Sequence, residues 1–204
     1  MAASIAVFMP VSTIHITRYH APCGTLILGA FEGRLCLCDW QTEQHREFVD
    51  KRLQQNLKAE IRVLDNELKS EELKGKRISG KMAKSGWSDI AVLQEAKRQL
   101  DEYFRKERKA FDLPLLFVGT DFQKRVWEAL RHIPYGTTVS YKELASLIGQ
   151  PQAVRAVANA NRQNAVSIIL PCHRVIGTDG SLTGYGGRLD IKQYLLDMEQ
   201  ATLF

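Results

Sequence analysis

Long apolar runs are missing from this sequence of 204 residues. A membrane-spanning helix needs about 20 consecutive apolar residues, and no stretch approaches that length. The first ten residues are apolar but carry no lysine or arginine, which argues against a secretory signal peptide. We therefore expect a cytoplasmic protein without membrane association.

Cysteine is scarce, and its spacing excludes the usual metal sites. The chain has four cysteines, at positions 23, 36, 38 and 172. No usual zinc pattern matches this spacing, and two of the cysteines fall within one expected strand. In a cytoplasmic protein they should be free thiols. We expect no metal site and no structural disulfide.

Acidic residues are absent from Leu144 to Thr178, although the chain as a whole has 23 of them. The same stretch contains Arg155, Arg162 and Arg174. Such a local excess of positive charge suits phosphate groups. The net charge of +5 is compatible with nucleic-acid binding and does not establish it.

The remaining composition is that of a folded chain, with 45% apolar and 25% charged residues. Alternating, β-branched stretches at 12–18, 25–31 and 34–40 predict three strands, and the short turns between them predict an antiparallel meander. Helical spacing follows at 43–57, and another strand is expected at 61–64. Residues 65–88 are polar and predict an exposed loop or linker. Nothing in residues 1–112 has catalytic spacing, so we expect a supporting subdomain there.

Residues 113–204 have a different pattern. A helix is expected from Thr120 to Leu130, and Ser140 with Glu143 forms a capping box that opens a short helix ending at Gly149. Pro151 is expected to begin the next helix. Two short helices joined by a tight turn predict a helix-turn-helix, and 190–200 predicts a closing helix. The expected fold is mixed α+β: an N-terminal antiparallel sheet with helices, then a mainly helical subdomain with a winged-helix-like helix-turn-helix.

The second helix of this motif is unusual for a major-groove reader, because it offers one arginine among small side chains: Ala153, Ala156, Ala158 and Ala160. Small residues allow close approach to a shallow surface. An ordinary alanine-rich packing helix explains the same pattern.

The stretch Ile168–Ile176 places Cys172 between two apolar, strand-like runs. His173 and Arg174 follow it directly, and both favour a thiolate, the form in which cysteine is a nucleophile. For an isolated Cys-His pair, a buried structural cysteine is the simpler interpretation. Asn164 is placed to pin the turn before the cysteine, and the loop containing Tyr185 is placed to shape a pocket wall.

Taken together, these residues resemble the O6-alkylguanine-DNA alkyltransferase family. The resemblance lies in their identity and order: Tyr141, Arg155-Ala-Val, Asn164, Pro171-Cys172-His173-Arg174-Val175, Tyr185 and Glu199. The resemblance is strong from about Gly119 to Glu199 and is only architectural over the expected meander. It implies direct reversal of DNA alkylation on double-stranded DNA that contains O6-alkylguanine, with O4-alkylthymine as an open second substrate.

The resemblance also implies roles for individual residues. Cys172 would accept the alkyl group, His173 would take its proton through a water, and Glu199 would orient His173. Tyr141 would assist base rotation and guanine departure, while Asn164 would support the catalytic turn. Arg155 would fill the gap left by the flipped base. The other implied DNA contacts are Ala153, Ala156, Ala158 and Arg162, and the implied substrate pocket is Val175, Tyr185 and Gly186.

Each molecule would act once, without a cofactor or metal, as a monomer that is nucleoid-associated when it acts on DNA. Two positions depart from the family pattern: Ala165 stands where proline is common, and Gly186 where serine occurs in some members.

Two other functions compete with repair. Lesion-binding relatives without transfer activity lack the cysteine, and a cysteine hydrolase would need a geometrically awkward dyad between adjacent residues.

Overall fold

The computed structural model describes residues 12–41, 43–64 and 88–200. Its N-terminal half is a four-stranded sheet in the order β3-β2-β1-β4. The strands are β1 (Ser12–Ala21), β2 (Gly24–Phe31), β3 (Arg34–Trp40) and β4 (Ala59–Val63). The expected antiparallel meander of the first three strands is confirmed. The fourth strand pairs in parallel with β1, because helix α1 (Glu43–Leu57) carries the chain across the sheet before β4 begins.

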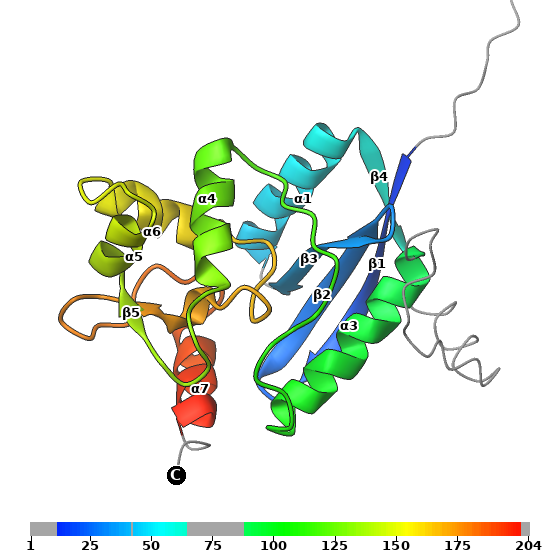
Figure 1. Ribbon diagram of the computed structural model, residues 1–204. Helices are drawn as coiled ribbons and strands as arrows, with labels where there is room; N and C mark the ends of the chain where they lie inside the picture. Colours follow the sequence, from blue (N-terminus) through cyan, green and yellow to red (C-terminus); the bar gives the residue numbers. More distant parts are fainter. Residues whose placement is uncertain (1–11, 42, 65–87, 201–204) are drawn as a thin grey trace, which may run out of the picture.

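Both faces of this sheet are covered by a helix (Figure 1). Side chains alternate between the faces along a strand, so Leu26 and Leu28 join one apolar cluster with α3 (Asp89–Phe104). Ile27 and Phe31 join the opposite cluster with α1. Burial on both faces explains why β2 and β3 are almost continuously buried.

The hairpin between β2 and β3 has a local cause. Glu32 and Gly33 both adopt positive φ angles, of 49° and 71°. Positive φ at both central residues is the requirement of the two-residue turns that match the twist of antiparallel strands.

The C-terminal half is mainly helical, and its elements are α4 (Asp121–Leu130), β5 (Val139–Ser140), α5 (Tyr141–Leu147), α6 (Val154–Arg162), a 3₁₀ turn η1 (Cys172–Arg174), β6 (Val175–Ile176) and α7 (Leu189–Gln200). Helices α5 and α6 pack on each other and on α4 as a helix-turn-helix. Capping boxes begin α4 at Thr120 and α5 at Ser140. Strands β5 and β6 form a small parallel sheet beside them. The expected mixed α+β fold is confirmed.

Two local expectations differ from the structure. Helix α6 begins at Val154 instead of Pro151, because residues 151–152 form a turn and Ala153 is the N-cap. The strand expected at 168–170 is wrong. Ile168 has a φ of 70°, and the Leu170 N–H donates to the Val166 carbonyl at 2.9 Å, so the chain folds back on itself. Apolar composition alone did not reveal this tight turn.

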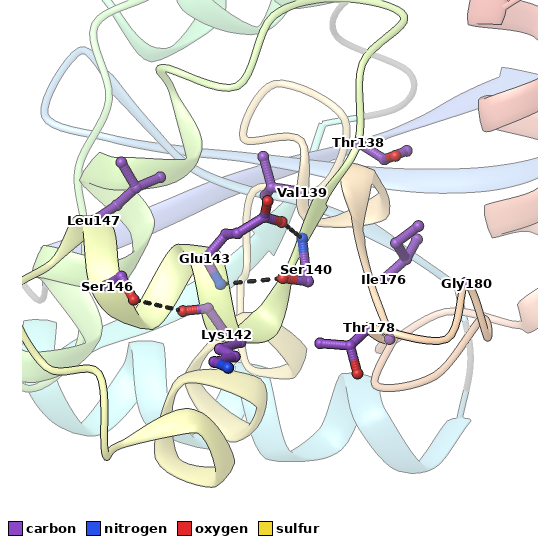
Figure 2. A pocket seen from close by; sticks show the side chains of 11 residues that line it. Thr138, Val139, Ser140, Lys142, Glu143, Ser146, Leu147, Ile176, Thr178 and Gly180 are labelled. Carbon is purple, nitrogen blue, oxygen red and sulfur yellow. Dashed lines mark hydrogen bonds between the residues drawn. The ribbon is translucent and has the colours of Figure 1, made fainter.

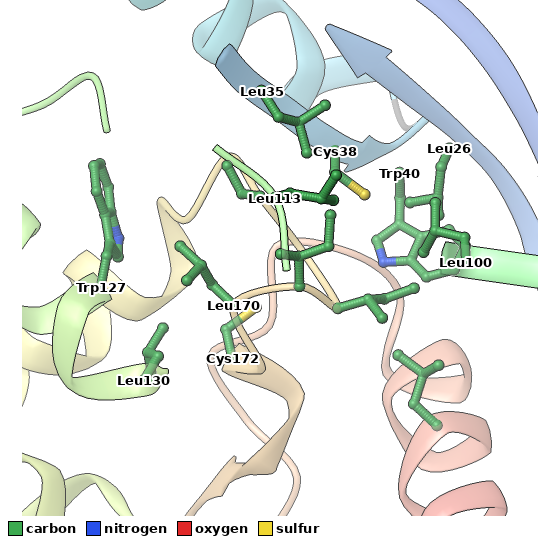
Figure 3. Packing of buried hydrophobic residues seen from close by; sticks show 14 of the residues in the cluster. Leu26, Leu35, Cys38, Trp40, Leu100, Leu113, Trp127, Leu130, Leu170 and Cys172 are labelled. Carbon is green, nitrogen blue, oxygen red and sulfur yellow. The ribbon is translucent and has the colours of Figure 1, made fainter. Parts of the chain in front are cut away.

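Strand β3 is the last strand of the sheet, and its edge that is not paired with β2 joins the two halves of the molecule. The Leu35 N–H donates to the Pro114 carbonyl and the Cys38 N–H to the Ala165 carbonyl, both at 2.8 Å. Side chains of both halves then share one apolar cluster, in which Leu170 and Cys172 lie near the sheet residue Cys38 (Figure 3). The segment that carries the cysteine is therefore docked against the N-terminal sheet.

The expected linker at 65–88 falls outside the described residues except for Ser88, which caps α3. The division at residue 112 stays a prediction. Within the described ranges, none of the helices has the length and apolarity that a bilayer crossing requires.

Candidate active site

Cys172 is the first residue of the 3₁₀ turn η1 and is 2% exposed. Asn164 fixes the preceding turn from both sides: its Nδ2 donates to the Leu170 carbonyl at 3.0 Å, and its Oδ1 accepts from the Val166 N–H at 2.9 Å. Asn161 donates to the carbonyl of Cys172 at 3.3 Å. Ala165, where a proline was expected from the family pattern, is held by its carbonyl bond to β3.

Burial raises the pKa of the Cys172 thiol to about 11, and the charge of Asp39 acts in the same direction. The hydrogen bond from Asn164 and the charge of Lys192 oppose this shift. Burial therefore outweighs the groups that favour the thiolate, and the resting protein holds a neutral thiol at pH 7. Arg174 does not contribute, because its guanidinium points elsewhere.

His173 is fully buried, and its Nε2 lies 2.9 Å from Glu199 Oε1. Burial lowers the pKa of His173, so the ring is neutral. A carboxylate can only accept, so the Nε2 proton is donated to Glu199 and Nδ1 carries the lone pair. Nδ1 has no hydrogen-bond partner among the described residues. The imidazole is thus held by Glu199, and its basic nitrogen has no partner among the described residues.

The buried carboxylate of Glu199 on α7 accepts hydrogen bonds from four residues. Burial alone would raise its pKa, but the hydrogen bonds of His173 and Arg174 and the charge of Arg174 outweigh burial and hold the pKa of Glu199 well below its usual range. Arg174 contacts both carboxylate oxygens at 2.9 Å. The Tyr103 hydroxyl and the Gly136 N–H also donate to it, at 2.7 and 3.1 Å.

Arg174 was expected on a phosphate-binding surface, and the structure contradicts this. Its side chain is buried, and Nη1 donates to the Ile133 carbonyl at 2.6 Å. A buried guanidinium with two carboxylate contacts is a structural ion pair. Its place in the sequence, directly after the histidine, gave no indication of this role.

Tyr141, the first residue of α5, is buried, and its hydroxyl donates to the Thr183 carbonyl at 2.7 Å. Burial raises its pKa to about 12, so the phenol keeps its proton. The ammonium of Lys192 donates to the carbonyls of Thr183 and Val175, at 2.9 and 2.6 Å. Burial lowers the pKa of Lys192 to about 8. The phenol is a proton donor that is currently bonded to the backbone.

The expected pocket wall is held by the N-terminal subdomain. Tyr185 is buried, and its hydroxyl accepts from Trp40 Nε1 at 2.7 Å. A Cβ on Gly187 would lie 2.7 Å from a Trp40 ring atom, so only glycine permits this close packing. Val175 is buried and Gly186 is half-buried.

The outward face of α6 carries the expected DNA contacts. Arg155, Ala156 and Arg162 are exposed, and Ala153 and Ala158 are partly exposed. The residues of this helix that face the core are Val157, Ala160 and Asn161. The two arginines are therefore exposed on a helix face that also carries small alanine side chains.

An open hollow of about 1080 Å³ lies beside this motif, between the start of α5 and the turn after β6 (Figure 2). Ser140 and Lys142 face Thr178 across it. It does not contain Cys172, so it is a groove on the surface and not the reaction pocket. Glu143 is the acidic residue in its lining, and its carboxylate accepts from the Ser140 N–H at 2.6 Å.

Sequence reasoning missed four residues around the cysteine, namely Asp39, Trp40, Tyr103 and Lys192. Three of them belong to the half that was expected to be only supporting. Each reads as an ordinary strand or helix residue, and Tyr103 shares an apolar helix face with Leu100. No local signal separates them from core residues, since their contacts depend on packing between distant segments.

A helix-turn-helix in the same half as a buried cysteine and a buried His-Glu pair defines a class: a DNA-binding protein with a nucleophile candidate. Two family models cover most of the chain. Residues 14–117 match the ribonuclease-like domain of 6-O-methylguanine DNA methyltransferase, and residues 121–201 match its DNA binding domain. The chain belongs to the 6-O-methylguanine DNA methyltransferase family.

Individual relatives agree with this assignment. A methylated-DNA–protein-cysteine methyltransferase of Methanosarcina barkeri is 57% identical over 110 residues, which is 54% of this chain and 70% of that protein. The constitutive enzyme of Bacillus subtilis is 54% identical over 109 residues, covering 53% and 66%. The crystal structure of Mycobacterium tuberculosis OGT in complex with DNA has a TM-score of 0.68 at 34% identity, covering 92% of this chain and 93% of that one.

Proposed function

We propose that this protein repairs O6-alkylguanine in double-stranded DNA by moving the alkyl group to Cys172, once per molecule. Its enzyme class is that of its relatives, methylated-DNA–protein-cysteine methyltransferase, and it acts on DNA by alkyl transfer. One observation carries the finer proposal: His173, which follows the buried Cys172 in the chain, has its Nε2 bonded to Glu199, while its Nδ1 has no partner among the described residues. That arrangement suits a general base for Cys172.

The chemistry is a displacement at carbon. His173 Nδ1 takes the Cys172 proton through one bridging water, and Sγ then attacks the alkyl carbon attached to O6. The carbon–oxygen bond breaks and guanine leaves with the electron pair, taking a proton from Tyr141 as that hydroxyl turns away from Thr183. A thiol of high pKa is a strong nucleophile once it is deprotonated. The thioether product has no group nearby that would hydrolyse it, so the protein is consumed.

Base flipping follows from the burial of Cys172. The O6 atom of a stacked guanine cannot reach a thiol that is 2% exposed, so the nucleotide must rotate out of the duplex. In this proposal α6 enters the minor groove, where its small side chains allow close approach, and Arg155 occupies the space that the base leaves. The hydroxyls and the lysine of the hollow in Figure 2 then follow the phosphate backbone.

The proposed DNA-contacting face belongs to one helix, α6, of one chain, so we propose that the protein acts as a monomer. O4-alkylthymine also presents an alkyl carbon on an exocyclic oxygen and is a second candidate substrate. Neither a metal nor a cofactor enters the proposed reaction.

Stoichiometry tests the proposal. A duplex with one O6-methylguanine is incubated in excess over the protein, and repaired strands are counted per molecule. We expect one repair event per protein for the wild type and none for Cys172→Ser. Continuing turnover would favour a hydrolase, and lesion binding without repair would favour a recognition protein; either result would overturn the proposal.

A further inference from the structure

A second buried hydrogen-bond chain approaches Cys172 from the N-terminal sheet. Asp39 of β3 is 0% exposed, and its Oδ1 accepts from the Ser167 hydroxyl at 3.0 Å. Ser167 Oγ in turn lies 4.0 Å from Cys172 Sγ, within reach of a sulfur hydrogen bond. The main-chain bond between Cys38 and Ala165 fixes the two segments next to each other. The proposed repair reaction uses neither Asp39 nor Ser167.

The direction of this chain follows from its proton count. A serine hydroxyl has one proton and two lone pairs, and a carboxylate has only lone pairs. The Ser167 proton therefore goes to Asp39, and the Ser167 lone pairs are left for the thiol. Cys172 is then the donor, and its S–H points at Ser167 Oγ. The same hydroxyl cannot also donate to a Cys172 thiolate.

We propose that Asp39 is a positioning residue that acts through Ser167 to keep Cys172 protonated until a substrate base occupies the site. No proton moves along this chain during the reaction, because the Cys172 proton leaves through His173. The benefit follows from single use, since an acceptor that cannot be regenerated is lost by any premature reaction with an electrophile. The inference rests on Cys172 being the proposed acceptor.

Other titratable groups also face this cluster, from four further segments. Those whose ionisation couples to that of Cys172 are Cys38 on β3, Tyr141 on α5, Tyr185 in the loop before α7 and Lys192 on α7. Arg52 of α1 is the cation whose charge couples to Asp39. Lys192 favours the thiolate and Asp39 opposes it. Without the Asp39 charge, the charge of Lys192 should therefore favour the Cys172 thiolate more strongly.

The test measures the thiol itself, without DNA. The rate at which iodoacetamide modifies the Cys172 peptide is followed by mass spectrometry between pH 7 and 12, on the full chain. For Asp39→Asn we expect a rate about tenfold higher at pH 7.5, since one pKa unit changes the thiolate fraction tenfold. We also expect the rate to level off about one pH unit lower than in the wild type. Ser167→Ala should show a smaller change in the same direction.

The double variant distinguishes a connected chain from two separate effects. If Asp39 acts through Ser167, the double variant reacts no faster than Asp39→Asn alone; a product of the two single effects would overturn the inference. A higher rate at every pH with no shift in the levelling point would indicate a loosened core and would also overturn it. Asp89→Asn is the matched control, because Asp89 accepts from the Gly33 N–H in the same subdomain. Failure of methyl transfer with these thiol differences intact would overturn only the proposed function.

Discussion

Glu199 shows how one residue sets the state of its neighbours. Its carboxylate accepts from Tyr103, Gly136, His173 and Arg174, so a single buried charge orients the base and neutralises the guanidinium. The neutral thiol beside it has the opposite character, because burial without a strong cation keeps it protonated. Reactivity at this site is thus controlled by the position of a base and not by a standing thiolate.

Glu199→Gln should lower the free energy of unfolding by about 3 kcal/mol at pH 7, because it leaves Arg174 buried without a counter-charge. The folded-state pKa of Glu199 lies below its unfolded value of about 4.3. Its contribution is therefore present above that pH and is lost as pH falls below it. Urea unfolding at pH 7 and pH 3 measures both effects, and the wild type should lose more stability than the variant.

Glu128→Gln is the matched control for this measurement. Glu128 pairs with Arg131 on the surface of α4, where an ion pair contributes about 1 kcal/mol or less. Equal losses for the wild type and Glu199→Gln between the two pH values would show that Glu199 is not the group that titrates.

At the scale of elements, α6 combines exposed and partly exposed alanines with two exposed arginines. Arg155→Ala should slow repair of O6-methylguanine in duplex DNA by a factor of about 100, because several kcal/mol of unstacking are no longer offset. Its reaction with free O6-benzylguanine should stay within about twofold of the wild type. Both rates are followed as loss of free Cys172, and equal losses would contradict a role in flipping.

Helix α5 presents Tyr141 at its first position, so its N-terminal capping box also positions the phenol. Ser140→Ala should cost about 1 kcal/mol of stability, since the Glu143 N–H loses its acceptor. Thermal unfolding measures the change. Ser146→Ala on the same helix removes only a bond to the Lys142 carbonyl and should have a much smaller effect. Similar shifts of the unfolding temperature for the two variants would show that the capping box contributes no more stability than the Ser146 hydrogen bond.

The sequence predicted those elements whose causes are local. The Glu32-Gly33 turn, the Ser140–Glu143 capping box and the spacing of α7 were recognisable because each depends on neighbours along the chain. The turn at Ile168 was not, since it is stabilised by Asn164 and by docking against β3. Burial of Arg174 was missed for the same reason: its partner, Glu199, is 25 residues away.

Across the whole molecule, the two halves complete one site. Trp40 holds Tyr185 and Tyr103 holds Glu199, so the N-terminal sheet and its helix support side chains of the C-terminal half. The N-terminal half thus supports the second half through direct contacts with side chains of the candidate site. Main-chain bonds from β3 to Pro114 and Ala165 help to bring these groups together, and no pattern within either half encodes them.

Tyr103→Phe tests this coupling. It removes one hydrogen bond to a buried carboxylate, which should cost about 2 kcal/mol of stability. It should also slow methyl transfer several-fold, because Glu199 holds His173 less firmly. Tyr194→Phe, at a partly exposed position on α7, is the control. Thermal unfolding and the single-turnover rate are measured for both, and a stability loss without a change in rate would separate Tyr103 from the active site.

The most direct measurement is the mass of the Cys172 peptide after the protein has reacted with duplex DNA that contains O6-methylguanine. Our account predicts that one methyl group replaces the thiol proton on Cys172 in every molecule that has repaired a lesion. The peptides that contain Cys23, Cys36 and Cys38 should be unchanged. Repaired DNA with an unmodified Cys172, or a methyl group on another residue, would contradict the account.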